Sequence, residues 1–433
     1  MNLANVHLWG RRIGAVNWDA GTELAHFEYD PEFIGSGIEI APLTMKLSPR
    51  IYSFPALPRE TFRGLPGLLA DSLPDDFGNA LIDAWLVQEG RAGQTLNAVE
   101  RLCYTGTRGM GALEYQPAQG PSATKSELVD VAAMVDLASA ILSRRGQFAG
   151  SLEPANRQDS LQEILRVGTS AGGARAKAII AWNPETNEVR SGQVGAGNEF
   201  SYWILKFDGV SGNRDKELAD PVGYGLIEYA YHKMAKAAGI DMKECRLLQE
   251  NGRSHFMTRR FDRTDTGNKL HMQSLCAMAH FDYKQAGAYS YEQALHIMRR
   301  LEMPMASIEE QFRRMAFNVV ARNQDDHVKN IAFLMNKEGV WALSPAFDMT
   351  YNYNPNGTWT HAHQMSLNGK RDDFQIDDFR ACARNASLKR GRAEEILLQV
   401  VAAVKQWPAM AEEAGVPRNI AERIQATHRM DIL

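Results

Sequence analysis

The sequence predicts an α+β fold made of three compact units, at residues 1–120, 128–262 and 263–433. Patterns typical of strands dominate the first two units, whereas patterns typical of helices dominate the third. Such segregation of strands from helices is typical of the α+β class. The length of 433 residues supports this division, because a single hydrophobic core rarely grows so large.

The first unit begins with strands and continues with short helices. Aromatic and branched residues in residues 1–55 are interrupted by glycine turns, which indicates short strands. In residues 66–90, apolar residues recur every four positions on both sides of Pro74, and this predicts short helices around a turn. Residues 101–117 end in a glycine-rich segment and a strand, and the Pro, Gly, Ser and Thr of residues 118–127 predict a linker.

The second unit combines one further sheet with two helices. Residues 129–142 read as a helix, and residues 163–190 read as strand, glycine loop, strand, turn and strand. A strand in residues 200–209 is followed by a helix in residues 222–240. The strand in residues 255–263 closes the unit.

Composition and charge describe an ordinary globular protein. Apolar residues make up 44% and charged residues 23% of the chain, and the net charge is 48 − 52 = −4. No broad basic surface for nucleic acid is therefore expected. The four cysteines form no C-x-x-C pair, so we expect buried free thiols in a reducing compartment. The N-terminus lacks the apolar segment of a signal peptide and no stretch is long enough to span a bilayer, which predicts a cytoplasmic protein without membrane contact.

Residues 168–173, GTSAGG, form the first candidate functional segment. Three glycines in six positions allow backbone N–H groups to approach an anion closely. The loop could cover the phosphates of ATP, or it could be a plain flexible hairpin. It is not a Walker A loop, because no G-K-[ST] follows and a strand comes next. Ser170, at its centre, is either a phosphorylation site or an exposed turn residue.

Lys206 is the second candidate, because it lies within an otherwise apolar strand. A lysine in a buried strand is costly unless its charge is paired, although a lysine on an edge strand can simply face water. Glu228, on the predicted helix that follows, offers the required carboxylate. Protein kinases use such a strand lysine and helix glutamate to hold the α- and β-phosphates.

A polar cluster follows an amphipathic helix that is expected to end near Arg322. Asp325 precedes Asn330 by five positions, which is the separation in the H-R-D-x-x-x-x-N catalytic loop of kinases. There the carboxylate orients the substrate hydroxyl, and the amide oxygen binds a metal ion. A hairpin in residues 331–349 then leads to Asp348, a natural magnesium ligand in the position of the DFG aspartate.

Neighbouring polar residues leave some assignments open. Asp326 is adjacent to Asp325, and only the spacing to Asn330 favours Asp325 as the catalytic residue. His327 and Lys329 either orient the loop or contact phosphate. His361 and His363 would suggest zinc, but two histidines without further ligands at a known spacing are a weak signal, so we interpret them as loop or strand residues.

These segments resemble the HipA family of serine/threonine kinase toxins from bacterial toxin–antitoxin systems. The resemblance covers nearly the whole chain and lies in seven ordered strings. They are PGLLADSLPDDFG (66–78), RGMGALEY (108–115), GTSAGGARAKA (168–178), ILKF (204–207), RRFDR (259–263), DDHVKN (325–330) and FDM (347–349).

The resemblance implies a two-lobed, protein-kinase-like fold related to phosphoinositide kinases, with an extra β-rich N-terminal subdomain. It implies ATP and Mg²⁺ as cofactors, and Asp325 as the catalytic aspartate. The metal ligands would be Asn330 and Asp348, and Ser170 would be autophosphorylated, which inactivates the kinase. Asp326 stands where the family often has glycine. The implied nucleotide-binding residues are Gly172, Gly173, Ala174, Arg175, Ala176, Lys177, Lys206, Arg259, Arg260, Phe261, His327, Asn330 and Asp348.

The resemblance also implies a substrate and a partner. The substrate would be an aminoacyl-tRNA synthetase, glutamyl-tRNA synthetase in the best-known relative, whose phosphorylation halts translation and growth. The partner would be a HipB-like helix-turn-helix antitoxin, through which the toxin contacts DNA only indirectly. Two alternatives stay open: a kinase of the same fold that acts on a small molecule, and a non-catalytic partner of a DNA-binding repressor.

Overall fold

The computed structural model describes residues 1–91, 94–120, 126–143, 175–193, 195–210, 223–264 and 267–432. Its N-terminal region, residues 1–120, is built on an antiparallel four-stranded sheet with the order β3-β2-β1-β4. The strands are β1 Leu3–Leu8, β2 Arg11–Asp19, β3 Leu24–Tyr29 and β4 Leu113–Gln116. The last strand returns from over a hundred residues away to pair with β1, so the N-terminal region closes on itself.

Five helices connect β3 to β4. They are α1 Pro31–Ile34, α2 Arg59–Phe62, α3 Gly67–Ala70, α4 Asp76–Gln88 and α5 Ala98–Thr105. The turn predicted at Pro74 separates α3 from α4, and Asp75 caps α4 by accepting a hydrogen bond from the Gly78 N–H. This cap fixes where the carboxylate of Asp75 lies.

The second sheet has five antiparallel strands in the order β6-β5-β7-β9-β8. Its strands are β5 Lys177–Trp182, β6 Val189–Ser191, β7 Ser201–Lys206, β8 Cys245–Glu250 and β9 Arg253–Arg259. Strand β7 lies between β5 and β9, so Lys206 is on an interior strand and the edge-strand interpretation is wrong. Strand β8 was not predicted, because its buried positions recur every third residue instead of alternating.

Helices cover this sheet from two sides. Helix α4 of the N-terminal region and α6 Val131–Ser143 share one apolar cluster with β5, β7 and β9. On β7, Trp203 and Leu205 belong to that cluster. Successive side chains of a strand point to opposite faces, so Lys206 points the other way, toward α8 Tyr224–Ala237.

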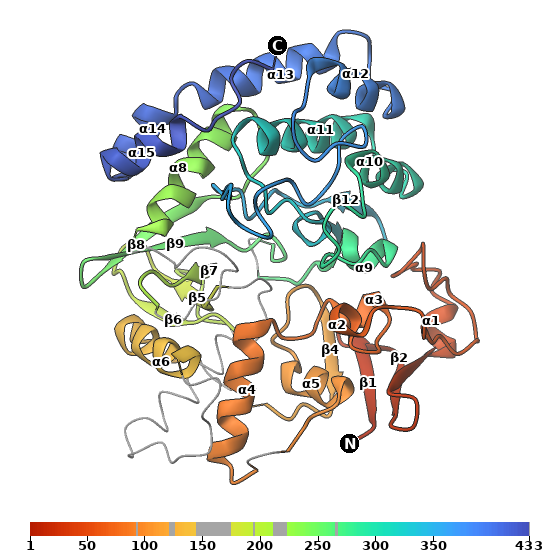
Figure 1. The fold of residues 1–433 in the computed structure, drawn as a ribbon. Coiled ribbons are helices and arrows are strands. Elements are labelled where there is room, and N and C mark those ends of the chain that lie inside the picture. Colours follow the sequence, from red (N-terminus) through yellow and green to blue (C-terminus); the bar gives the residue numbers. More distant parts are fainter. Residues whose placement is uncertain are drawn as a thin grey trace.

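The remaining chain is mainly helical around a small sheet. Strands β10 His271–Ser274, β11 Ala332–Met335 and β12 Trp341–Leu343 form the three-stranded sheet, and the predicted hairpin is the β11–β12 pair. Figure 1 shows the blue C-terminal helices gathered at the end of the molecule far from the N-terminus. The helices are α9 Leu275–Ala279, α10 Tyr291–Arg300, α11 Met305–Val320, α12 Ile376–Asn385, α13 Arg392–Val404, α14 Trp407–Ala414 and α15 Arg418–Gln425.

The α+β class is confirmed, and the largest core joins distant parts of the chain. One apolar cluster runs from the N-terminal sheet through α8 to the C-terminal helices, so the N-terminal region packs directly against the helical part. All four cysteines are buried free thiols, as expected. Across the described ranges, no helix has the length and apolar character needed to cross a membrane.

Candidate active site

The site begins with an ion-pair network around Lys206. Its ammonium Nζ lies 2.6 Å from Glu228 Oε1 and 2.6 Å from Asp348 Oδ1. Glu228 is 2% exposed, and its other oxygen lies 3.6 Å from the Arg175 guanidinium. The ion pair expected between the strand lysine and the helix glutamate is therefore present, and Asp348 joins it from the segment after the β11–β12 hairpin.

The charges of this network are mutually stabilised. Burial lowers the pKa of Lys206, but the carboxylates of Asp348 and Glu228 outweigh burial, so the net pKa is raised. Burial raises the pKa of Asp348, but Lys206 and Lys177 outweigh it, so the net pKa is lowered. Lys206 and Asp348 are consequently both ionised at neutral pH.

The catalytic loop follows α11 and contains Asp325 and Asn330. The Asn330 amide Nδ2 donates to the backbone oxygen of Asp325 at 2.9 Å, which holds the two residues together across the short 3₁₀ turn η1 Val328–Asn330. The Asp325 carboxylate accepts a hydrogen bond from the Trp359 indole N–H at 2.6 Å. His327 Nε2 lies 3.8 Å from the same carboxylate oxygen.

The adjacent Asp326 is a buried structural residue. Its side chain is fully buried and accepts hydrogen bonds from Tyr291 Oη at 2.5 Å, from His363 Nδ1 at 2.7 Å and from the Gln364 N–H at 2.7 Å. Burial raises the pKa of Asp326, but His363 and the hydrogen bonds outweigh burial, so the net pKa is lowered. Geometry thus separates the two aspartates, and Asp325 is the one that is partly exposed.

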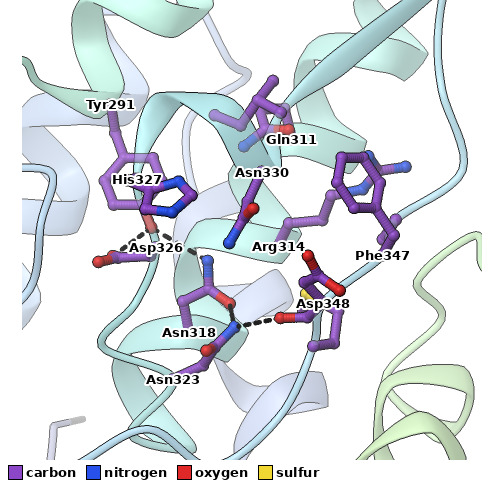
Figure 2. A pocket seen from close by; sticks show the side chains of 13 residues that line it. Tyr291, Gln311, Arg314, Asn318, Asn323, Asp326, His327, Asn330, Phe347 and Asp348 are labelled. Carbon is purple, nitrogen blue, oxygen red and sulfur yellow. Dashed lines mark hydrogen bonds between the residues drawn. The ribbon is translucent and has the colours of Figure 1, made fainter. Parts of the chain in front are cut away.

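A small cavity of about 20 Å³ is lined in part by this loop. Its lining includes His327, Asn330 and Asp348 together with Asn318 and Asn323 of the supporting layer. Figure 2 shows that Asn323 donates both to Asn318 and to the backbone oxygen of Asp348. The amide layer therefore ties the end of α11 to the segment that carries Asp348.

The oxygen donors in this cavity suit magnesium. Asp348 offers a carboxylate, and Asn330 keeps its amide oxygen available because the bond to Asp325 uses only its nitrogen. Hard oxygen ligands of this kind are what Mg²⁺ prefers. Within the described residues no cluster of three or more His, Cys, Asp or Glu side chains is arranged for a metal. His363, one of the two histidines considered for zinc, is instead bonded to Asp326 and to Arg429 Nη1 at 2.9 Å.

Only some of the residues predicted to form the phosphate loop lie within the part of the chain that the structure describes. Ser170, Gly172, Gly173 and Ala174 lie outside the described residues. Arg175 is 8% exposed and its guanidinium stacks 4.1 Å from the centre of the Tyr224 ring. Ala176 is fully buried in the apolar cluster under the sheet. Lys177 begins β5 and pairs in register with Lys206.

Residues 259–261, which the family resemblance implied to bind nucleotide, form a packed connection. Arg259 ends β9, and the Phe261 ring packs 5.4 Å from Phe347, the neighbour of Asp348. The Arg260 guanidinium makes two hydrogen bonds to the buried Asp262, at 2.9 and 2.8 Å. Asp262 also accepts a hydrogen bond from the Gly111 N–H at 2.7 Å, so this connection is joined to the N-terminal region.

Three residues near the site escaped sequence reasoning: Trp359, Asp262 and Asp75. Trp359 lies in an irregular segment without a motif, and its contact with Asp325 spans 34 positions. Asp262 lay within a recognised string, and the arginines on both sides of it were the available signal. Asp75 could be identified as a helix cap, but its approach to Lys177 depends on the tertiary fold.

Comparison with known proteins places the chain in a family. Residues 169–407 match the model of the HipA-like C-terminal domain, which is more than half of the chain. Residues 4–116 match the HipA N-terminal domain. The chain belongs to the HipA family. The motif strings that first suggested this family therefore identified it correctly.

Two known proteins are similar to this HipA-family chain. A chain of the Shewanella oneidensis MR-1 toxin–antitoxin system HipA, HipB and operator DNA complex aligns with a TM-score of 0.66, covering 98% of this chain and 94% of that chain at 16% identity. The two therefore share a fold. A protein of Haemophilus influenzae named "Putative kinase" is 29% identical over 134 residues. The match covers 28% of this chain and 39% of that protein, so it spans about two fifths of the relative's length.

Proposed function

We propose that this protein is an ATP-dependent serine/threonine protein kinase and the toxin of a toxin–antitoxin system, acting in the cytoplasm. The observation that carries the proposal is the Lys206 ammonium held 2.6 Å from both Glu228 and Asp348. In kinases, the strand lysine paired to a helix glutamate holds the nucleotide phosphates, and the DFG aspartate binds their metal ion. The three residues lie here in that relationship, on β7, α8 and the segment after β12.

Asp325 is the proposed catalytic residue. Its carboxylate would accept or orient the proton of the substrate hydroxyl as that oxygen attacks the γ-phosphorus and the bond to the β-phosphate oxygen breaks. Trp359 and the backbone link to Asn330 hold it in place. Lys206 would keep the phosphates in position, and Glu228 would keep Lys206 in position.

The proposed cofactors are ATP and Mg²⁺. Asn330 and Asp348 would hold magnesium, which when bound neutralises phosphate charge. Arg175 to Lys177 and Arg259 to Phe261 would flank the nucleotide, with His327 beside the catalytic carboxylate. Ser170 is proposed as the autophosphorylation site, and Gly172 to Ala174 as the phosphate-covering backbone.

The proposed partner is a HipB-like helix-turn-helix antitoxin, and the proposed substrate is an aminoacyl-tRNA synthetase. The fold shared with a toxin chain described in complex with HipB and operator DNA supports the partner. The net charge of −4 favours DNA contact through such a partner over direct binding. The substrate proposal rests on the motifs of the family.

Transfer of labelled phosphate in a cell lysate tests the function. The purified protein and γ-labelled ATP with magnesium are added to lysate, and the label is followed separately in protein and in small molecules. We expect label in one or a few proteins, including a synthetase, and none with Lys206→Met. Label found only in a metabolite would instead identify a small-molecule kinase. If the wild-type protein transfers no label to protein or to small molecules, the kinase proposal is wrong, and the remaining hypothesis is a non-catalytic partner of a repressor.

A further inference from the structure

A carboxylate of the N-terminal region reaches the edge of the candidate nucleotide site. Asp75 caps α4 through Oδ1, which accepts from the Gly78 N–H at 2.7 Å. Its Oδ2 lies 3.5 Å from the ammonium of Lys177, and both side chains are only 4% exposed. Two charges this deeply buried depend on each other, because removal of one leaves the other desolvated and uncompensated.

Lys177 occupies the position on β5 that matches Lys206 on β7. The two residues are direct partners in the antiparallel register, so their side chains extend from the same face of the sheet. Both ammonium groups act on the same carboxylate, since Lys206 and Lys177 lower the pKa of Asp348. Lys177 is therefore a second basic residue beside the Lys206 network.

The electrostatics of Asp75 and Lys177 agree with this geometry. Burial lowers the pKa of Lys177, and Asp75 and Asp348 oppose that effect. Burial raises the pKa of Asp75, and Lys177 is the first group to oppose it. Burial outweighs these partners, so the net pKa of Lys177 is lowered and the net pKa of Asp75 is raised, and each group offsets only part of the burial effect on the other.

The segment that carries Asp75 is also anchored to the helical part of the molecule. Asp71, four residues earlier, accepts hydrogen bonds from the Ser274 N–H at 2.6 Å and from Ser274 Oγ at 2.8 Å. Burial lowers the pKa of Lys329, next to Asn330 in the catalytic loop, but the surrounding groups, Asp71 first among them, outweigh burial, so the net pKa is raised. Residues 71–75 therefore run from the helical part of the molecule to the five-stranded sheet.

We propose that Asp75 positions Lys177 for the terminal phosphates of ATP, as Glu228 positions Lys206, so that the N-terminal region completes the nucleotide site. This inference rests on the proposed kinase function and adds a positioning residue to it. In this account Asp75 does not touch the nucleotide. It holds the Lys177 side chain on the face of the sheet that carries Lys206, and the triphosphate supplies the further anion that favours the charged form of Lys177.

Nucleotide affinities of a double-mutant cycle test the inference. MgATP and AMP binding are measured by calorimetry for wild type, Asp75→Asn, Lys177→Met and the double variant. Asparagine still caps a helix, so α4 should begin as before. We expect Asp75→Asn to weaken MgATP binding about tenfold and AMP binding less than twofold, because AMP lacks the terminal phosphates. In the Lys177→Met background, Asp75→Asn should change MgATP affinity less than twofold.

A matched control tests whether the effect is specific to Asp75 or follows the loss of any carboxylate on helix α4. Asp83→Asn removes one carboxylate from the same helix at a side chain that is 55% exposed and paired with Arg101, and it should leave both affinities unchanged. Should Asp75→Asn fail to fold, Asp75→Ser keeps a capping oxygen and replaces it.

Three results would overturn the role of Asp75: wild-type MgATP affinity in Asp75→Asn, equal losses for MgATP and AMP, or a full additional loss in the Lys177→Met background. A wild-type protein that binds no MgATP would overturn the proposed function as well. The two failures are thus distinguishable.

Discussion

Asp325 and Asp326 are adjacent in the chain but lie in opposite environments. The Asp326 side chain is fully buried between Tyr291 and His363, whereas the Asp325 side chain is 29% exposed and receives the indole N–H of Trp359. One carboxylate therefore supports the loop, and the other is available to a substrate. This division decides which residue is expected to affect stability and which is expected to affect transfer.

Asp326→Asn is expected to destabilise the protein. An amide cannot provide the charge that His363 faces, and one of three buried donors is left without a proper acceptor. We expect the free energy of unfolding to fall by about 2–4 kcal/mol, measured by urea unfolding followed by tryptophan fluorescence. Asp377→Asn, at a side chain that is 83% exposed, should change it by less than about 0.5 kcal/mol. Equal, small effects of both variants would contradict the structural role of Asp326.

Glu228→Gln is expected to reduce transfer because Lys206 loses its buried partner. We expect kcat/KM for ATP to fall about 10²-fold, corresponding to about 2.7 kcal/mol, in a steady-state assay with labelled ATP. The control is Glu413→Gln, whose side chain is 68% exposed and pairs with Lys233 of the same helix α8. It should retain wild-type kinetics. Unchanged kinetics in Glu228→Gln would show that Lys206 does not need this carboxylate.

Trp359→Phe should lower kcat while leaving KM for ATP nearly unchanged. The substitution keeps an aromatic ring but removes the N–H that holds Asp325 Oδ1 at 2.6 Å. Loss of one charge-assisted hydrogen bond corresponds to about 1.5–3 kcal/mol, so kcat should fall by one to two orders of magnitude. A change confined to KM for ATP would mean that Trp359 acts on nucleotide binding instead.

His280 should make the docking of the N-terminal region sensitive to acid. Its Nε2 accepts a hydrogen bond from the Gly67 N–H at 3.1 Å, and burial lowers its pKa to about 4. The unfolded value is about 6.5, so the unfolded state binds the proton first. The contribution of His280 to stability is complete above about pH 6.5 and is lost progressively as the pH falls to about 4.

His280→Gln checks this dependence, because glutamine can accept the bond from Gly67 but does not titrate in this range. Other buried histidines, such as His271 with a pKa of about 3, titrate in both proteins and cancel in the comparison. The slope of unfolding free energy against pH between pH 6 and 4.5 should therefore be smaller in the variant, by up to about 1.4 kcal/mol per pH unit. Identical slopes would contradict the assignment.

Local patterns were sufficient to predict most of the elements. The helix that became α11, the break at Pro74 and the β11–β12 hairpin follow from apolar spacing and turn residues. Strand β8 was missed because its burial pattern does not alternate. The motif spacing also favoured Asp325 over Asp326, which remains a prediction, and in the structure Asp325 is the more exposed of the two.

Contacts between segments that are distant in the sequence could not be predicted from local sequence patterns. The pairing of Lys206 with Glu228 was predictable because a strand and the next helix pack together. Trp359 against Asp325 and Asp75 against Lys177 join segments with no local signal for each other. Such contacts are set by the packing of the N-terminal region and of the segment after β12, which only the tertiary fold determines.

We propose that Asp325 orients the substrate hydroxyl that attacks the γ-phosphate of an ATP held by Lys206. The most direct measurement is the rate of labelled-phosphate transfer to protein at saturating MgATP for wild type and Asp325→Asn, with MgATP affinity measured in parallel. The account predicts transfer by the wild type, a loss of at least about 10²-fold in the variant, and MgATP affinities within about twofold. No transfer by the wild type, or transfer by Asp325→Asn at the wild-type rate, would contradict it.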